Sequence, residues 1–179
     1  MNIIKLVLIG VLSLVALLLI VALFTKKNYG VIREVTINKP KSVVFAYVKL
    51  LKNQENFSVW ASKDPEMKKV YLGTDGTTGF VSAWESKMKD VGKGEQEIMK
   101  IVADDRIDYE LRFKEPFASV SSAYITFEAV SEMQTKVKWG FTGNMKYPMN
   151  LFLLATDMEG MIGKDFQDGL NNLKGILEK

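Results

Sequence analysis

The feature that most constrains this chain is an uncharged, strongly apolar run near its N-terminus, from Leu6 to Phe24. Fifteen of the 19 residues in this run are Leu, Ile, Val or Phe. A helix of that length is about 28 Å long, close to the roughly 30 Å hydrocarbon core of a bilayer. The apolar side chains together favour membrane insertion by at most about 5 to 9 kcal/mol. The run therefore predicts one membrane-spanning helix over residues 6–24.

Two other interpretations of the run compete with the anchor. A buried core helix would be shorter and would carry a polar face, which this run lacks. A cleaved signal peptide has an apolar stretch of about 7–15 residues and then small residues at the cleavage site. The residues from Val21 to Thr25 fit such a site poorly. We expect an anchor, and the signal peptide is the main alternative.

The basic residues on either side of the run predict its orientation. Lys5 precedes it, whereas Lys26, Lys27, Arg33, Lys39 and Lys41 follow it. Because basic residues near a span favour the cytoplasmic side, we expect a single-pass membrane protein with its folded part on the cytoplasmic face. Residues 1–27 are expected to form the anchor and residues 28–179 one domain, since about 150 residues are enough for one core.

Composition removes several classes of function. The net charge of +3 comes from three lysines in residues 1–27, which leaves 21 basic and 21 acidic residues in the domain. A neutral domain lacks the basic face of a nucleic-acid-binding protein. The chain has no cysteine and no histidine, so it has no disulfide, no thiolate zinc site and no histidine base. We therefore expect no nucleic acid partner, no metal and no cofactor.

The residue pattern of the domain alternates between helix and strand signals. A strand is predicted over 31–38, a helix from Pro40 to about Leu51, and a short second helix around Phe57 and Trp60. From there to Asn144 the pattern is one of strands and tight turns, with glycine-rich turns at 73–76 and 92–94. Three segments alternate apolar with polar residues, as half-buried strands of an antiparallel meander do. Their apolar positions are Ile107, Tyr109, Leu111 and Phe113, then Ala123, Ile125, Phe127 and Ala129, and then Val137, Trp139 and Phe141.

A long terminal helix is predicted from Pro148 to Leu177, with an apolar side at helical spacing. Gly160, Gly163, Gly169 and Gly175 are unusual there, because each glycine costs about 1 kcal/mol relative to alanine inside a helix. Close approach of the helix to the sheet, or a helix that bends over a cavity, would explain them.

The predicted order of strand, helix, short helix, six strands and long helix is that of an α+β helix-grip fold, a curved antiparallel sheet of about seven strands around a C-terminal helix. Over residues 30–179 the chain resembles the SRPBCC superfamily, which includes START and polyketide cyclase/dehydrase-like domains. The residues that carry the resemblance are Ile37-Asn38-Lys39-Pro40 with Val44-Phe45, Trp60 with Asp64-Pro65, Gly76, Gly79, Trp84, Gly94, Ile98, Leu111-Arg112-Phe113 before Pro116, Thr135 to Trp139, and Gly169-Leu170 with Leu173-Lys174.

The resemblance implies an apolar pocket between the sheet and the terminal helix, but not a particular reaction. The leading hypothesis is membrane-tethered binding of a hydrophobic small molecule or lipid. The residues expected to line the pocket are aromatic or large and apolar: Trp84, Tyr109, Phe113, Phe127, Trp139, Phe141, Phe152, Met158, Ile162 and Phe166. The same residues would also serve simply as core.

Two alternatives stay open. A cyclase- or hydrolase-type enzyme would need a buried carboxylate from among Glu95, Glu97, Glu128, Asp157 and Glu159, with Tyr109 or Tyr124 as proton donor. Glu159 is a weak candidate because it falls on the apolar side of the terminal helix. The other alternative is a protein-interaction module of the co-chaperone type, which would expose an apolar patch away from the pocket.

Overall fold

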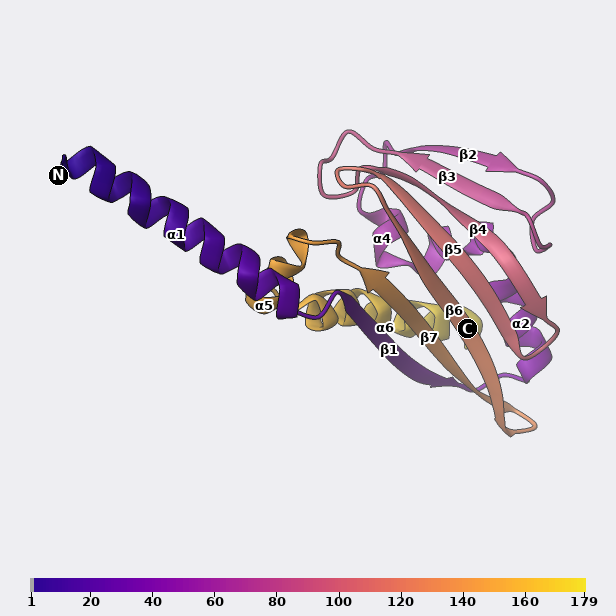
Figure 1. Cartoon of the computed structure of the whole chain (residues 1–179). Coiled ribbons are helices and arrows are strands. Elements are labelled where there is room, and N and C mark those ends of the chain that lie inside the picture. Colours follow the sequence, from indigo (N-terminus) through magenta and orange to yellow (C-terminus); the bar gives the residue numbers. More distant parts are fainter. Residues whose placement is uncertain (1) are drawn as a thin grey trace.

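The computed structural model describes residues 2–179 and begins with a long helix, α1 (Ile3–Phe24), that projects away from a curved sheet (Figure 1). Ala22 is the one residue of α1 that is buried. The helix is long and apolar enough to cross a membrane. A core helix of a soluble protein would be mostly buried, so the exposure of α1 does not fit that interpretation.

Seven antiparallel strands form one sheet in the order β1-β7-β6-β5-β4-β3-β2. The strands are β1 (Asn28–Ile37), β2 (Lys68–Leu72), β3 (Val81–Glu85), β4 (Lys93–Val102), β5 (Arg106–Glu115), β6 (Ser119–Ser131) and β7 (Gln134–Asn144). β1 pairs with β7, so the strand that follows α1 lies beside the strand that comes last in the sequence. The predicted α+β helix-grip fold with seven strands is confirmed.

Apart from α1, the helices lie either on one face of this sheet or, for η2 and α5, beside the end of α1 (Figure 1). They are α2 (Lys41–Lys49), the short helices η1 (Leu51–Asn53), α3 (Gln54–Phe57) and α4 (Val59–Ser62), then η2 (Met149–Leu151), α5 (Phe152–Ala155) and the long α6 (Met158–Leu177). α6 packs along β1, and α3 and α4 touch α6 from the other side.

The prediction of one continuous terminal helix from Pro148 is wrong. The chain forms η2 and α5 first and breaks at Thr156, which has extended backbone angles. Asp157 then caps α6, because its carboxylate accepts a hydrogen bond from the Gly160 N–H at 2.8 Å. An aspartate at this position satisfies a free N–H of the first turn and starts a new helix.

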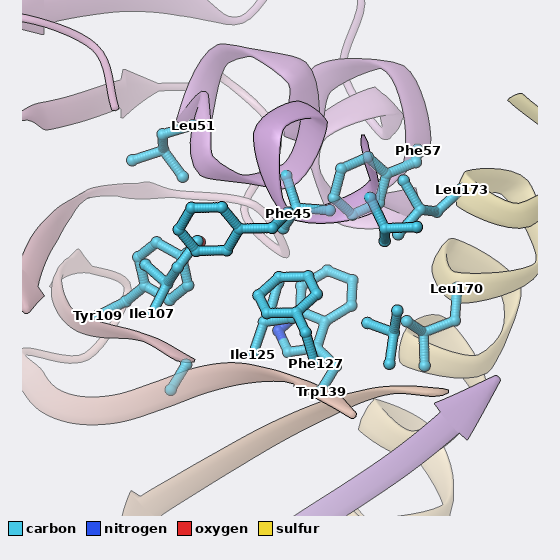
Figure 2. Close-up of a cluster of buried hydrophobic side chains, with 14 of the residues drawn as sticks. Phe45, Leu51, Phe57, Ile107, Tyr109, Ile125, Phe127, Trp139, Leu170 and Leu173 are labelled. Atoms are coloured by element: carbon cyan, nitrogen blue, oxygen red, sulfur yellow. The ribbon is translucent and has the colours of Figure 1, made fainter. Parts of the chain in front are cut away.

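The predicted alternation in the strands is confirmed for the central positions. Ile107 and Tyr109 in β5 are buried, as are Ile125 and Phe127 in β6 and Val137, Trp139 and Phe141 in β7. Leu111 and Phe113 in β5 are only half-buried, and Ala129 is exposed beside the β6–β7 turn. Figure 2 shows Ile107, Tyr109, Ile125, Phe127 and Trp139 of the sheet gathered with Phe45 and Leu51 from the α2–η1 region, Phe57 of α3, and Leu170 and Leu173 of α6.

Two of the four glycines in α6 lie where the helix closely approaches side chains of the sheet. A Cβ on Gly163 would lie 2.1 Å from Nη2 of Arg33, and a Cβ on Gly169 would lie 3.1 Å from Cζ3 of Trp139. Gly175 faces open space, because a Cβ added there would meet no atom of the described chain within 4 Å. The glycines at 163 and 169 therefore let α6 lie directly on β1 and on the Trp139 ring.

Candidate ligand-binding site

The residues expected to line a pocket divide into three groups by burial. Tyr109, Phe127, Trp139 and Phe141 are buried in the core. A second group is half-buried: Trp84, Phe113, Met158, Ile162 and Phe166. Phe152 lies apart from both groups, because it belongs to α5 and is 52% exposed. Nine of the ten expected residues are thus at least partly inside the domain.

Aromatic rings fill much of the space between the sheet and α6. Trp139 stacks on Phe166 with ring centroids 4.2 Å apart, and Phe141 meets Phe166 edge-on at 6.3 Å. Phe57 closes the other side of Trp139 at 5.8 Å. Trp84 and Phe113 form a separate edge-on pair at 5.8 Å. In this conformation the rings contact one another, so a ligand would have to displace some of them.

Two polar atoms are buried in the part of the core covered by α2 and the short helices, where Tyr109 lies near Leu51 and Phe45 (Figure 2), and have no hydrogen-bond partner among the described residues. They are the Tyr109 hydroxyl and Nε2 of Gln54, on side chains that are 2% and 8% exposed. A buried polar atom without a partner costs about 1–3 kcal/mol. A polar group on a bound ligand would remove that cost for both atoms.

The environment keeps Tyr109 protonated. Burial raises the pKa of its phenol above the ordinary value of 10, and the negative charges of Asp75 and Asp108 raise it further. The side chain of Gln54 lies beside the phenol and lowers its pKa in part, so the two buried polar groups are neighbours. Tyr109 is therefore a neutral hydrogen-bond donor at physiological pH. Sequence reasoning missed Gln54, because a polar residue in a short helix gives no periodic signal of burial.

Two open hollows lie at the surface rather than between the sheet and α6. One, of about 400 Å³, is at the β1 edge and is lined by Gly30, Val31, Ile32, Tyr124, Phe141, Thr142 and Glu159. The other, of about 470 Å³, is lined mainly by polar residues near the C-terminus, including Asn56, Asn171 and Asn172. Tyr124, Phe141 and Glu159 are the three sequence-predicted site residues that reach the first hollow.

None of the candidate carboxylates is buried. Glu159 is exposed on the first turn of α6, Asp157 caps that helix, and Glu128 is exposed on β6. Among residues 2–179, the buried polar side chains include no aspartate or glutamate. The same part of the chain contains no group of three or more potential metal ligands.

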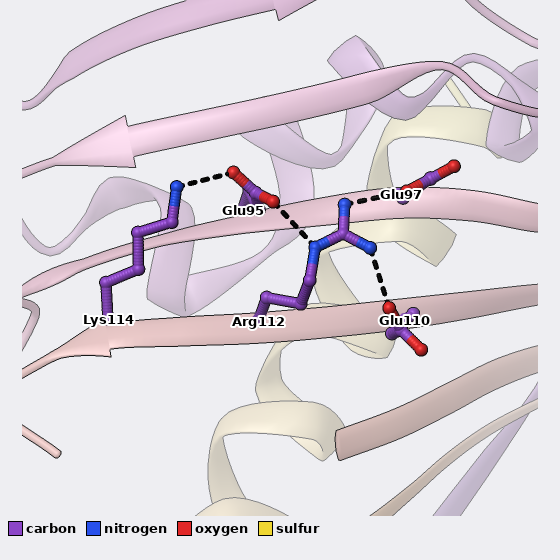
Figure 3. Close-up of polar contacts among 5 residues, drawn as sticks. All are labelled: Glu95, Glu97, Glu110, Arg112 and Lys114. Atoms are coloured by element: carbon purple, nitrogen blue, oxygen red, sulfur yellow. Dashed lines mark hydrogen bonds and ion pairs between the residues drawn. The ribbon is translucent and has the colours of Figure 1, made fainter. Parts of the chain in front are cut away.

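Glu95 and Glu97 lie on the face of the sheet opposite Tyr109, where they belong to an ion-pair network (Figure 3). Arg112 donates from Nε to Glu95 at 2.6 Å, from Nη2 to Glu97 at 2.7 Å and from Nη1 to Glu110 at 2.6 Å. Hydrogen bonds from Lys114 and Arg112 lower the pKa of Glu95 below its ordinary value. The network places three neighbouring carboxylates around one guanidinium group on the sheet surface.

Asn150 joins the long N-terminal helix to the domain, and sequence reasoning did not identify it. It is fully buried in η2, and its Nδ2 donates to the backbone carbonyls of Ala22 at 2.7 Å and Thr25 at 2.9 Å. Carbonyls in the last turn of a helix have no partner within the helix, so Asn150 caps α1 from outside. The last turn of α1 is therefore part of the folded domain.

Comparisons with known proteins agree with this architecture. The sequence profile of the family described as "Polyketide cyclase / dehydrase and lipid transport" matches residues 30–178. No curated protein matches the chain.

Similar solved structures share the fold at low sequence identity. Norcoclaurine synthase from Thalictrum flavum has a TM-score of 0.65 at 8% identity, with 84% of this chain and 93% of that chain covered. Its complex with dopamine and hydroxybenzaldehyde scores 0.63 at 10% identity, with coverage of 88% and 90%. An uncharacterized protein from Rhizobium leguminosarum scores 0.56 at 18% identity, with coverage of 85% and 95%. With the fold, the inward-facing aromatic residues and the profile match in agreement, the chain belongs to the polyketide cyclase/dehydrase and lipid transport family.

Proposed function

We propose that this chain is a membrane-tethered protein that binds a hydrophobic small molecule or lipid between its sheet and α6. The observation that carries the proposal is the pair of buried, unpaired polar atoms on Tyr109 and Gln54 within an interior that is otherwise aromatic and aliphatic. A ligand with a large apolar body and one polar group matches both properties. Family membership supports the same class of ligand.

Entry of such a ligand requires the interior to open. α6 packs mainly along β1, at one edge of the sheet, and also contacts β7 and the short helices α3 and α4. Movement of α6 away from β7 would uncover the stacked rings of Trp139 and Phe166 without breaking strand pairing. The half-buried Met158 on the first turn of α6 has a flexible, unbranched side chain that can adapt to a ligand, and the half-buried Ile162 lies one turn further along the helix.

The tether is supported by both composition and packing. α1 is uncharged over the length of a bilayer core, and its last turn is built into the domain through Asn150 and Ala22. A cleaved leader would leave the buried Asn150 amide without its partners, so the packing favours α1 as a permanent anchor over a signal peptide. The basic residues after the span favour the cytoplasmic face for the domain.

Parallel purification of three full-length proteins in one detergent tests ligand binding. They are the wild type, Tyr109→Phe and, as a matched control, Tyr124→Phe, whose hydroxyl lies on the opposite face of the sheet. Native mass spectrometry and solvent extraction should find a compound enriched in the wild type and in Tyr124→Phe, and depleted in Tyr109→Phe. Equal levels of the same lipids in all three would identify them as lipids around α1, and the binding proposal would fail.

The tether has its own test. Intact-mass measurement should find α1 still attached, and alkaline carbonate should leave the chain in the membrane pellet. A mature chain that begins after Thr25 would identify a signal peptide instead.

The catalytic and interaction alternatives gain less support. A carboxylate base in a dry pocket is the feature that the enzyme hypothesis needs, and the aspartates and glutamates of residues 2–179 lie outside the core. Exposed apolar side chains do occur away from the interior, but those beside α1 are better explained by contact with lipid than by a protein partner.

A further inference from the structure

The segment after β7 places apolar side chains next to the end of the long N-terminal helix. We infer that η2 and α5, residues Met149–Ala155, insert into the interfacial region of the same bilayer that α1 spans. The inference rests on the proposed tether and extends it, because it gives the domain a second membrane contact and one preferred orientation on the lipid surface.

The depth of this segment follows from its contact with α1. Asn150 of η2 bonds to the carbonyl of Ala22, and Ala22 is fully buried by that contact. Ala22 is two residues from the end of the apolar run, which is about 3 Å along a helix axis. α1 contacts η2, and η2 continues directly into α5, which is drawn near the C-terminal end of α1 in Figure 1. A bilayer that accommodates Leu6 to Phe24 must therefore also meet η2 and α5, at the boundary between acyl chains and headgroups.

Several large apolar side chains face outward at this level, whereas the exposed acidic residues Asp157 and Glu159 come only after α5, at the start of α6. Phe152 is 52% exposed and Leu154 is 64% exposed, although both are large hydrophobic residues. Met149, Tyr147 and Met161 are exposed in the same region. Interfacial helices bury an apolar face about 5–10 Å into the boundary of headgroups and acyl chains, and tyrosine is enriched at that level. Contact with lipid would bury this surface.

The charged residues at the two ends of the sheet favour the same orientation, with the α1 end of the domain toward the lipid. Lys27 and Lys146 are held close together, because the Met145 N–H donates to the Lys27 carbonyl at 2.8 Å. Lys26 is next to them in the sequence, and all three lysines are exposed. Such a cluster favours anionic lipid headgroups. By contrast, the β4–β5 and β6–β7 turns at the opposite end of the sheet carry Asp104, Asp105 and Glu132.

The β5–β6 turn adds an apolar residue at the same end. Phe113 pairs with Ser119 across this turn, and Ser122 pairs with Thr142 near the end of β7. This register puts the turn at the end of the sheet where β1 leaves α1. Phe117 in the turn is 69% exposed. A domain resting on its anchor-side end would bring this phenylalanine toward the lipid as well.

Site-specific fluorescence in the full-length protein tests the inference, because the chain has no cysteine and single cysteines can be labelled cleanly. Leu154→Cys reports on α5. Met133→Cys is the matched control, since Met133 is 60% exposed but lies in the β6–β7 turn at the far end. Val15→Cys, at the centre of the apolar run, reports on the tether itself. Each variant is labelled with an environment-sensitive dye and reconstituted in vesicles of equal parts phosphatidylcholine and phosphatidylserine.

Quenchers attached at different depths of the acyl chain then give the position of each dye. The dye at residue 154 should be quenched most by the shallow quencher, the dye at residue 15 most by the deep quencher, and the dye at residue 133 by neither. Water-like emission at residue 154 together with deep quenching at residue 15 would overturn the inference while leaving the tether intact. Absence of quenching at residue 15 would overturn the tether first. A dye at residue 154 that is shielded from water but not quenched by lipid would indicate a protein partner or a second copy, which also contradicts the inference.

Discussion

The side-chain amide of Asn150 and the backbone carbonyl of Ala22 lie 2.7 Å apart, across 128 residues of sequence. This bond, with the one to Thr25 at 2.9 Å, makes the orientation of α1 a property of the folded domain. An anchor joined only by a flexible linker would leave the domain free to rotate on the membrane.

Replacing Asn150 with leucine should therefore loosen the joint between α1 and the domain. The change removes two hydrogen bonds to carbonyls that have no other helical partner, at a cost of about 1–3 kcal/mol. Hydrogen exchange in nanodiscs should become faster over residues 22–27 and 145–155, whereas exchange in β4 and β5 should stay the same. Asn144→Leu is the matched control, since its amide bonds to Asn28 on the exposed surface. Equal effects from both variants would contradict a special role for Asn150.

Tyr109→Phe should stabilise the ligand-free protein, because it removes a buried hydroxyl that has no hydrogen-bond partner among the described residues. The gain in the free energy of unfolding should be up to about 1–3 kcal/mol, measured by urea unfolding of delipidated protein in detergent. Tyr124→Phe, on the opposite face of the sheet, should leave stability nearly unchanged. A large loss of stability in Tyr109→Phe would mean that the hydroxyl has a partner and is not available to a ligand.

The same residue predicts a loss of stability in alkali. Burial raises the pKa of Tyr109 above 10, so the folded state keeps its proton at a pH where the unfolded chain loses it. This contribution to stability is fully present below pH 10 and falls as the pH rises beyond it. Wild type should therefore lose stability more steeply than Tyr109→Phe above pH 10, and parallel curves would contradict the prediction.

Arg112→Gln should destabilise the protein most at neutral pH, because it leaves Glu95, Glu97 and Glu110 adjacent without their shared cation. The expected cost at pH 7 is about 1–2 kcal/mol for three partly exposed pairs. The pKa of Glu95 is lowered in the folded state, so its contribution is present above the ordinary value of 4.5 and is lost as the pH falls through the lower folded value. The difference between variant and wild type should shrink below pH 4.5.

Urea unfolding at several pH values measures this difference directly. Lys164→Gln serves as the control, since Lys164 forms a single exposed pair with Asp168 and its loss should change stability much less than the loss of Arg112. A difference at Arg112 that is independent of pH would point to lost side-chain packing instead of charge.

Alanine at two glycines of α6 should have opposite effects. Gly175→Ala has open space around the new methyl group and should raise the free energy of unfolding by about 0.5–1 kcal/mol through helix propensity. Gly169→Ala should not show this increase, because its new methyl carbon would lie only 3.1 Å from Cζ3 of Trp139 and 3.3 Å from the Phe57 carbonyl oxygen. Thermal unfolding of both variants in the same detergent checks the contrast. Equal stabilisation would show that α6 does not pack tightly against Trp139 and Phe57.

The parts of the fold that follow a regular period were predictable from the sequence. In β5 the alternation at Ile107 and Tyr109 indicated which side chains point inward, and the structure agrees. The sequence-based prediction missed the break before α6, because the apolar helical spacing continues through Phe152. Asp157 is a residue type that caps helices, and its side chain does accept a hydrogen bond from the Gly160 N–H. Asn150 and Gln54 were not predictable, since the burial of a single polar residue depends on contacts with distant parts of the chain.

The pairing of β1 with β7 has a consequence for how the protein is made. β1 runs directly from α1 and pairs along its whole length, from Asn28 opposite Asn144 to Ile37 opposite Thr135. During synthesis β1 leaves the ribosome well before β7, the last of the seven strands. β1 must therefore wait with both edges open until the other six strands have been translated. Such long-range pairing slows folding and exposes the waiting strand to aggregation, so the period before the sheet closes is when this protein most needs a chaperone.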